Sequence, residues 1–125
     1  MKAAIGLLLL MSAPLAAQLA PNAEVFTHVP WKARLKANPL ASDPDAKAAG
    51  QKLFRQHCAQ CHGASAEGTK GAPMLVGAAM LDAKPGELFW VVTNGVVRKG
   101  MPSWSGLPPQ QRWQIVTFLE SLNRP

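Results

Sequence analysis

The two cysteines of the chain, Cys58 and Cys61, are separated by two residues and followed directly by His62. This Cys-x-x-Cys-His pattern is the attachment motif of c-type haem. Two thiols three residues apart at the end of a helix can each form a thioether with one vinyl group of the same porphyrin. The next residue then offers its imidazole nitrogen, a suitable ligand for iron. The motif therefore predicts a chain that folds around one large covalent cofactor.

Three other uses of the two thiols stay open at this point. A thiol redox site normally lies on a strand-to-helix unit, and no stretch of the chain alternates long enough to predict a sheet. A structural zinc site needs four ligands, and only His28 and His57 remain as donors beyond the motif, neither at zinc-finger spacing. A disulfide across so short a loop is possible but stabilises little. The sequence favours haem attachment.

Three segments carry the signals of helices. Asp43 followed by Pro44 predicts a helix start, and apolar residues then recur at helical spacing to residue 57. A second helix is predicted over residues 85–94, with a glycine at its end. A third is predicted from about residue 109 to about residue 123, with an apolar stripe along one face.

A loop rich in Gly, Ala and Pro separates the first two of these helices, from residue 63 to about residue 84. The compact part, residues 42–125, thus holds 84 residues with a long irregular stretch in its middle. Such a domain has little apolar side-chain volume for an independent core. We therefore expect an all-α fold in which three main helices pack around the covalently bound haem.

The N-terminus differs in composition from the rest of the chain. Lys2 is followed by an apolar run over residues 3–11 and then by small residues. This pattern is typical of a secretory signal peptide, so we expect a leader over residues 1–17, with cleavage after Ala17 or, alternatively, after Ala20. An uncleaved membrane anchor is the competing interpretation, although the run is short for a bilayer.

Residues 18–41 lie between the leader and the compact part. They contain three prolines and a basic cluster, and they show no helical or strand period. We expect either an extended arm, laid over the domain through Val25, Phe26 and Trp31, or a flexible linker.

The iron of a haem held by His62 needs a sixth ligand or an open position. Three methionines lie outside the predicted leader: Met74, Met80 and Met101. Met101 lies in a loop bounded by glycine and proline, which could bring its thioether to the far face of the haem. A thioether ligand raises the reduction potential. We therefore predict Met101 as the distal ligand and interpret Met74 and Met80 as packing residues.

With this motif and the Met101-Pro102 loop, residues 43–125 resemble the class I c-type cytochromes of the bacterial exported kind. In that family the first and last helices cross nearly at right angles, where a glycine lets their backbones approach and aromatic residues pack. Gly50, Phe54 and Phe118 match this pattern. A glycine inside a helix costs about 1 kcal/mol relative to alanine and so needs a packing reason. The resemblance implies a small cytochrome c fold.

The resemblance also implies which residues surround the haem. A proline after the motif typically offers its carbonyl oxygen to the other ring nitrogen of the proximal histidine, and Pro73 matches this position. Trp90 and Trp104 are expected to wall the haem, where an indole N–H could reach a propionate; a plain core role is the alternative.

The resemblance implies single-electron transfer, because iron with both axial positions filled by His62 and Met101 does not bind substrate. We therefore expect an electron carrier rather than an enzyme. A tightly bound subunit of a larger dehydrogenase or reductase is the main alternative. A haem peroxidase or ligand sensor, which would need an open sixth position, is a further one.

The net charge of +6 comes from 13 basic and 7 acidic residues, and it falls to +5 without the leader. A positive carrier would be steered toward redox partners with an acidic docking surface. The basic residues are scattered and form no nucleic-acid recognition motif. We expect a periplasmic protein without stable membrane insertion after cleavage.

Overall fold

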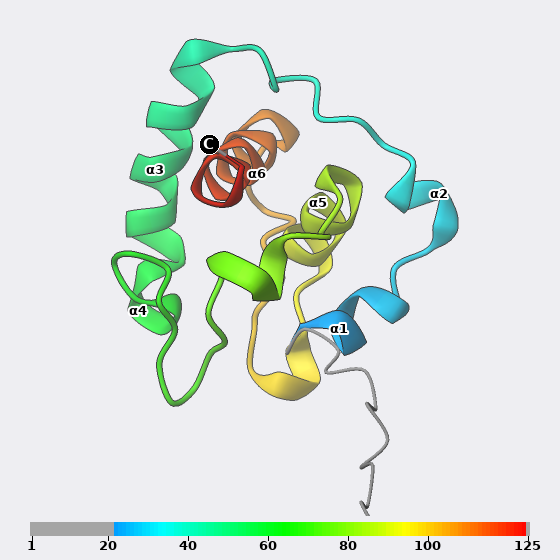
Figure 1. Cartoon of the computed structure of the whole chain (residues 1–125), viewed down its shortest axis with the longest axis vertical. Coiled ribbons are helices and arrows are strands. Elements are labelled where there is room, and N and C mark those ends of the chain that lie inside the picture. Colours follow the sequence, from blue (N-terminus) through cyan, green and yellow to red (C-terminus); the bar gives the residue numbers. More distant parts are fainter. Residues whose placement is uncertain (1–21, 125) are drawn as a thin grey trace, which may run out of the picture.

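The computed structural model of the chain describes residues 22–124, so the predicted leader over residues 1–17 lies outside the described residues. Within them the fold is helical, without β-strands. Figure 1 shows α3 along one edge, α2 at the opposite edge, and α5 and α6 between them. The elements are α1 (Ala23–Thr27), α2 (Trp31–Arg34), α3 (Pro44–His57), α4 (Ala59–His62), the 3-10 helix η1 (Gly77–Met80), α5 (Pro85–Asn94), the 3-10 helix η2 (Val97–Lys99) and α6 (Pro109–Asn123).

The three main helices begin where local chemistry predicts, which confirms the all-α expectation. At the start of α3, the carboxylate of Asp43 accepts a hydrogen bond from the backbone N–H of Asp45 at 2.9 Å. At the start of α5, the carboxylate of Glu87 accepts one from the backbone N–H of Lys84 at 2.9 Å. These bonds satisfy backbone donors that have no partner inside the helix.

The α3–α6 crossing forms the centre of the fold. A Cβ atom on Gly50 would overlap the backbone carbonyl of Gln114 and approach Cβ of Phe118 at 2.9 Å. The rings of Phe54 and Phe118 pack beside this contact with centroids 5.3 Å apart. Glycine therefore sits where the two backbones come closest, and the aromatic pair fills the space next to it.

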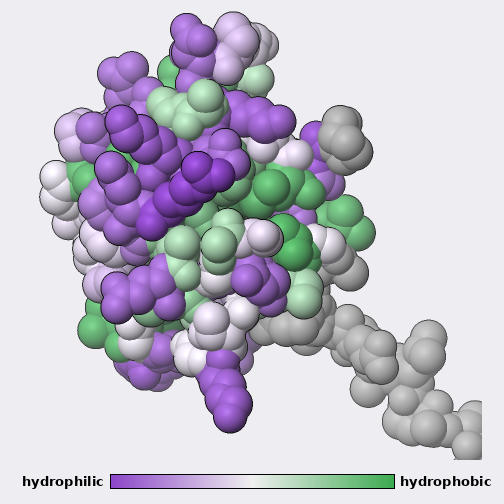
Figure 2. All heavy atoms as spheres, turned by 90° about the vertical axis from the view of Figure 1, so that its left-hand side faces the viewer, coloured by the Kyte–Doolittle hydropathy of each residue, from purple (hydrophilic) through white to green (hydrophobic). Residues whose placement is uncertain are grey.

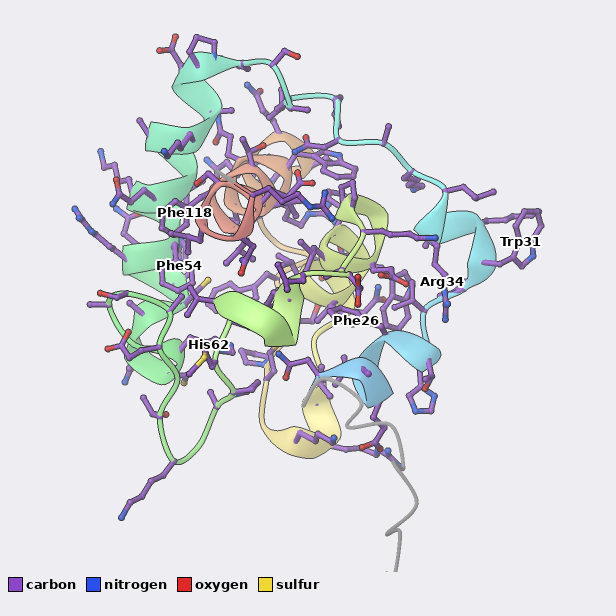
Figure 3. All side chains as sticks on the ribbon, in the orientation of Figure 1. Phe26, Trp31, Arg34, Phe54, His62 and Phe118 are labelled. Carbon is purple, nitrogen blue, oxygen red and sulfur yellow. The ribbon has the colours of Figure 1, made fainter. Side chains whose placement is uncertain are left out.

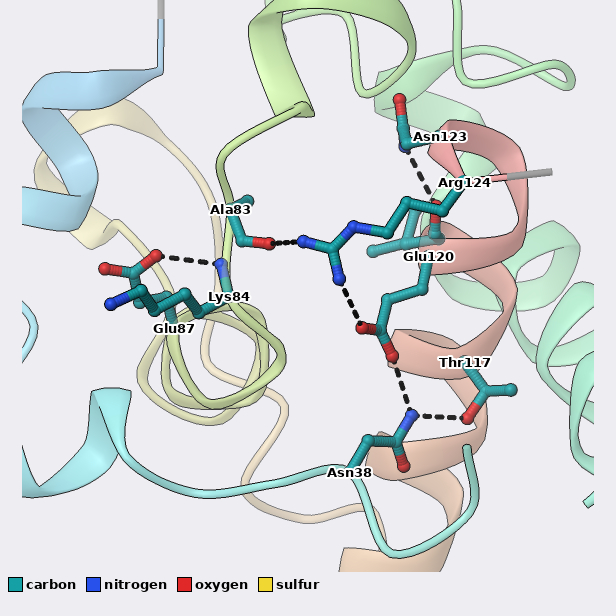
Figure 4. Close-up of polar contacts among 9 residues, drawn as sticks. Asn38, Ala83, Lys84, Glu87, Thr117, Glu120, Asn123 and Arg124 are labelled. Carbon is teal, nitrogen blue, oxygen red and sulfur yellow. Dashed lines mark hydrogen bonds and ion pairs between the residues drawn. The ribbon is translucent and has the colours of Figure 1, made fainter. Parts of the chain in front are cut away.

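Helix α5 packs on the other side of α6. The rings of Phe89 and Trp113 stack with centroids 4.1 Å apart. Close to the chain end, the guanidinium of Arg124 donates to the carbonyl oxygen of Ala83 at 2.9 Å and pairs with Glu120 at 3.3 Å (Figure 4). The end of α6 is thus tied to the residues that lead into α5. The buried core comprises Phe54, Ala66, Met80, Ala83, Leu88, Val92, Trp113, Ile115, Val116, Phe118 and Leu119.

The segment before α3 is folded, which corrects the expectation of an extended or flexible arm. Residues 22–41, called the arm below, contain the short helices α1 and α2, and both pack against α5. Phe26 packs against the core, whereas Trp31 is 67% exposed and projects outward (Figure 3). The arm therefore contacts the domain through Phe26, and the expectation of such a contact through Trp31 was wrong.

The outer face of α3 is hydrophilic. Seen from that side, polar and charged side chains gather on the surface (Figure 2). The exposed residues of α3 include Lys47, Lys52 and Arg55. Over residues 22–124, no helix combines the length and the apolar character needed to cross a membrane.

Candidate haem site

A cavity of about 360 Å³ opens among α3, α4, α5, α6, the arm and the loop after η2. Its walls are mostly apolar. The predicted ligand and pocket residues that line it are Cys58, Cys61, His62, Pro73, Met101 and Trp104. Residues from three separate stretches of sequence thus converge on one space.

The two thiols lie at the junction of α3 and α4. The backbone N–H of Cys58 donates to the carbonyl oxygen of Phe54 at 2.8 Å, and that of His62 donates to the carbonyl oxygen of Cys58 at 2.9 Å. Both thiols are free, with Cys61 exposed and Cys58 half-buried. Burial, helped by the neighbouring Cys61, raises the pKa of the Cys58 thiol to about 11. A redox-active cysteine needs a lowered pKa, and burial shifts the pKa of Cys58 the other way.

His62 is buried at 8% exposure on the wall of the cavity. Its Nδ1 lies 2.9 Å from the carbonyl oxygen of Pro73, the contact expected at this position. Because a carbonyl oxygen only accepts, Nδ1 donates its proton and Nε2 keeps its lone pair. A hydrogen bond from Nδ1 to a carbonyl oxygen fixes the orientation of the ring and makes Nε2 a stronger metal ligand.

The loop between the motif and Pro73 is shaped by backbone bonds. The backbone N–H of Gly68 donates to the carbonyl oxygen of His62 at 2.7 Å, and that of Leu75 to Ala66 at 2.9 Å. The hydroxyl of Thr69 donates to the carbonyl oxygen of Cys61 at 2.6 Å. These bonds fold the loop back over α4 and bring Pro73 to the imidazole.

Met101 is brought to the cavity by a tight return of the chain after α5. Val96 and Met101 exchange two backbone hydrogen bonds, of 3.0 and 3.2 Å, around η2. Gly95 and Gly100 both have positive φ, and a Cβ on Gly95 would crowd the backbones of Met101 and Pro102. Only glycine combines a positive φ with room for the neighbouring backbone at residue 95.

The other sequence-predicted residues divide between the cavity and the surface. Trp104 lines the cavity and packs against His57 with ring centroids 4.9 Å apart. Trp90 lies in a separate hollow beside Glu24 and His28 and does not line the cavity. Met80 is buried, as a packing residue would be, but Met74 is 49% exposed, so its assignment to the packing was wrong.

Sequence reasoning missed the contribution of the arm to the cavity. Asn22, Val25 and Phe26 all line it. A five-residue helix leaves no readable period, so the available signal was the adjacent apolar pair Val25-Phe26.

The donor set fits a covalently held haem. Two free thiols, an imidazole with its lone pair on Nε2 and a thioether line one apolar cavity. These groups match the two attachment points and two axial ligands of a c-type haem. Among the described residues, no group of three or more His, Cys, Asp or Glu side chains could hold a metal ion by itself.

Known proteins resemble this chain in sequence. Residues 45–119 match the family described as cytochrome c oxidase, cbb3-type, subunit III. The cbb3-type oxidase subunit CcoP of Rubrivivax gelatinosus is 49% identical over 59 residues, which are 47% of this chain and 17% of that protein. Subunit FixP of Bradyrhizobium sp. (strain ORS 278) is 35% identical over 105 residues, 80% of this chain and 35% of that protein. The chain thus spans only a minor part of these relatives.

Solved structures agree with this match. Cytochrome cL from Methylophaga aminisulfidivorans superposes with a TM-score of 0.60 at 27% identity, over 70% of this chain and 59% of that one. Cytochrome cL from Hyphomicrobium denitrificans gives 0.55 at 17% identity, over 89% and 64%, which shows the fold alone. The family match covers more than half of the chain. The chain is therefore a c-type cytochrome domain, with haem c as its cofactor, and it belongs to the family of cbb3-type cytochrome c oxidase subunit III.

Proposed function

We propose that this domain carries single electrons on one haem c attached through Cys58 and Cys61 and held between His62 and Met101. The observation that carries the proposal is the single apolar cavity lined by both thiols, His62 and Met101. The hydrogen bond from His62 to Pro73 supports it further, because that bond orients the imidazole as a metal ligand.

A bound haem would supply an iron that alternates between the ferrous and ferric states. His62 would hold this iron through Nε2, and the Pro73 carbonyl keeps the imidazole in one tautomer. Met101 offers a soft sulfur that favours the ferrous state. Leu88, Val92 and other apolar residues keep water out, which disfavours the extra positive charge of the oxidised state. If His62 and Met101 both bind the iron, no place is left on it for a substrate, so these residues would support electron transfer rather than catalysis.

Replacing Met101 tests the proposed ligand set. Met101→Ala should lower the midpoint potential and turn the ferric protein from low spin to high spin, because the sixth ligand is lost. Met74→Ala is the matched control, since this half-exposed methionine does not line the cavity. Potentiometric titration followed by absorption provides both readouts.

Met80 is the competing thioether, because it also lines the cavity. A Met80→Ala variant should stay low spin if Met101 is the ligand. If Met101→Ala keeps the spin state and potential of the parent protein while Met80→Ala changes both, the assignment of Met101 is wrong.

A second candidate function is that of a bound subunit within a larger redox enzyme. The match to oxidase subunits favours it, since the chain corresponds to 17% and 35% of two such proteins. The haem site would be the same, and only the partner would differ. Purification from the native source separates the two: co-elution with a larger enzyme supports the subunit, and a free monomer supports the diffusing carrier.

The leader over residues 1–17 and a periplasmic location are part of the same proposal. The sequence pattern of residues 1–17 supports both the leader and the periplasmic location. Cytochrome c domains typically work outside the cytoplasm. An acidic partner surface is the docking site that the net charge of +5 without the leader favours.

A further inference from the structure

We propose that the arm, residues 22–41, forms a wall of the haem pocket and limits the access of water and small ligands to the iron. The inference deepens the proposed function and rests on the presence of haem in the cavity. The family match begins at residue 45, so these wall residues lie outside the part of the chain that the family defines.

The first step is the lining itself. Asn22, Val25 and Phe26 face the same cavity as His62 and Met101. Phe26 is half-buried against the core, whereas Trp31 on the same arm points away from it (Figure 3). The arm therefore presents one apolar surface to the pocket and another to solvent.

Asn22 fixes the start of this wall. Its side chain is buried at 6% exposure, and Nδ2 donates to the carbonyl oxygen of Met74 at 3.1 Å. The same nitrogen lies 3.6 Å from Sδ of Met80, which accepts weakly. Both partners follow Pro73 along the chain, so Asn22 joins the arm to the segment that carries the proximal carbonyl.

Glu24 joins the arm to the opposite side of the cavity. Its carboxylate lies 3.3 Å from Nζ of Lys99, two residues before Met101. Both side chains are more than half exposed, so the pair itself adds little stability. The Glu24–Lys99 pair positions α1 against the turn that carries Met101.

The rest of the arm is anchored away from the cavity. The guanidinium of Arg34 donates to the carbonyl oxygens of Phe26 at 2.7 Å and Val29 at 3.0 Å, which fixes α1 relative to α2. Nδ2 of Asn38 donates to Thr117 at 2.9 Å and Glu120 at 2.8 Å (Figure 4). With attachments at both ends, Phe26 is held in the wall rather than free to swing out.

This arrangement predicts a specific effect on the iron. A ligand that displaces Met101 must first reach the cavity. If the wall opens only rarely, the binding of that ligand is slow. Water kept out of the cavity favours the less charged ferrous state. Weakening the wall should therefore speed ligand binding and lower the midpoint potential together.

The test measures imidazole binding to the ferric holoprotein by stopped-flow absorption in Phe26→Ala and, in parallel, in Val25→Ala. Trp31→Ala is the matched control, because it removes an aromatic ring from the same arm outside the cavity. We expect binding about tenfold faster for Phe26→Ala, the effect of about 1.4 kcal/mol on the opening equilibrium. Val25→Ala should follow in the same direction, and Trp31→Ala should equal the parent protein.

Two results would overturn the inference. One is a binding rate equal to that of the parent in both cavity variants. The other is an equal acceleration in Trp31→Ala, which would indicate general loosening of the arm rather than loss of a wall. The comparison stands even if the parent iron has an open sixth position, because the arm would still restrict entry. A high-spin ferric spectrum of the parent protein would contradict the proposed ligands, whereas the rates of the variants would still test the role of the arm.

Discussion

Gly50 shows how a single residue sets the distance between the two helices that frame the haem. Its missing side chain leaves room for the carbonyl oxygen of Gln114. The neighbouring rings of Phe54 and Phe118 then pack with centroids 5.3 Å apart, and Phe54 also lines the cavity. The lack of a side chain at Gly50 and the packing of Phe54 on Phe118 together fix the crossing of the two helices.

We expect Gly50→Ala to lower the free energy of unfolding of the holoprotein by about 2 kcal/mol, the range found for overpacked cores. The added methyl group would meet backbone, which cannot move aside as a side chain can. Denaturant unfolding measures the effect. Gly106→Ala is the control, because a Cβ there meets nothing within 4 Å. Equal stability of Gly50→Ala and the parent would mean that the helices are further apart.

The residues of the site differ in how far the sequence could predict them. Cys58, Cys61 and His62 follow from spacing alone, because the chemistry of attachment demands that order. Trp90 was expected at the haem from the family resemblance, but it lies in a separate hollow. At about 100° per residue, it lies about 200° from Leu88 around α5. Leu88 lines the cavity, so the helical wheel already placed Trp90 on the other face.

At the scale of elements, the arm depends on α5 for its position. A Cβ on Gly86 would overlap the carbonyl oxygen of Ala33 and come within 3.0 Å of that of Lys36. Arg34 adds a contact to the buried carboxylate of Glu87 at 3.7 Å. Helix α2 therefore lies directly on the first turn of α5.

Gly86→Ala should detach the arm while leaving the α3–α6 crossing intact. We expect amide hydrogen exchange in residues 22–41 to become faster by at least about tenfold, with unchanged exchange in α6. Mass spectrometry of peptic fragments measures both regions. Gly71→Ala provides the control, since its Cβ would meet open space. Slow exchange of the arm in Gly86→Ala would show that it does not rest on α5.

The elements differ in predictability for a physical reason. Helices α3, α5 and α6 carry their own start signals and apolar stripes, and the sequence predicts each of them. Helices α1 and α2 have five and four residues, too few to be stable from local propensity. They exist because Arg34, Asn22 and Phe26 make contacts with residues far away in the sequence, and such contacts leave no periodic pattern.

The whole molecule is built around a space that its side chains do not fill. The cavity of about 360 Å³ is lined mostly by apolar side chains, and covering such surface with a large group is favourable. A chain with 84 residues in its compact part therefore gains much of its core from the cofactor. A cofactor in this cavity would explain how a domain with so little apolar side-chain volume forms a core.

The most direct test of the account is the absorption spectrum of the ferric holoprotein during a reductive titration. We predict a low-spin ferric haem with the long-wavelength charge-transfer band of a methionine–iron bond, reduced reversibly in a single one-electron step. This result follows if His62 and Met101 fill both axial positions in the one cavity that they share. A high-spin ferric spectrum without that band would contradict the central claim.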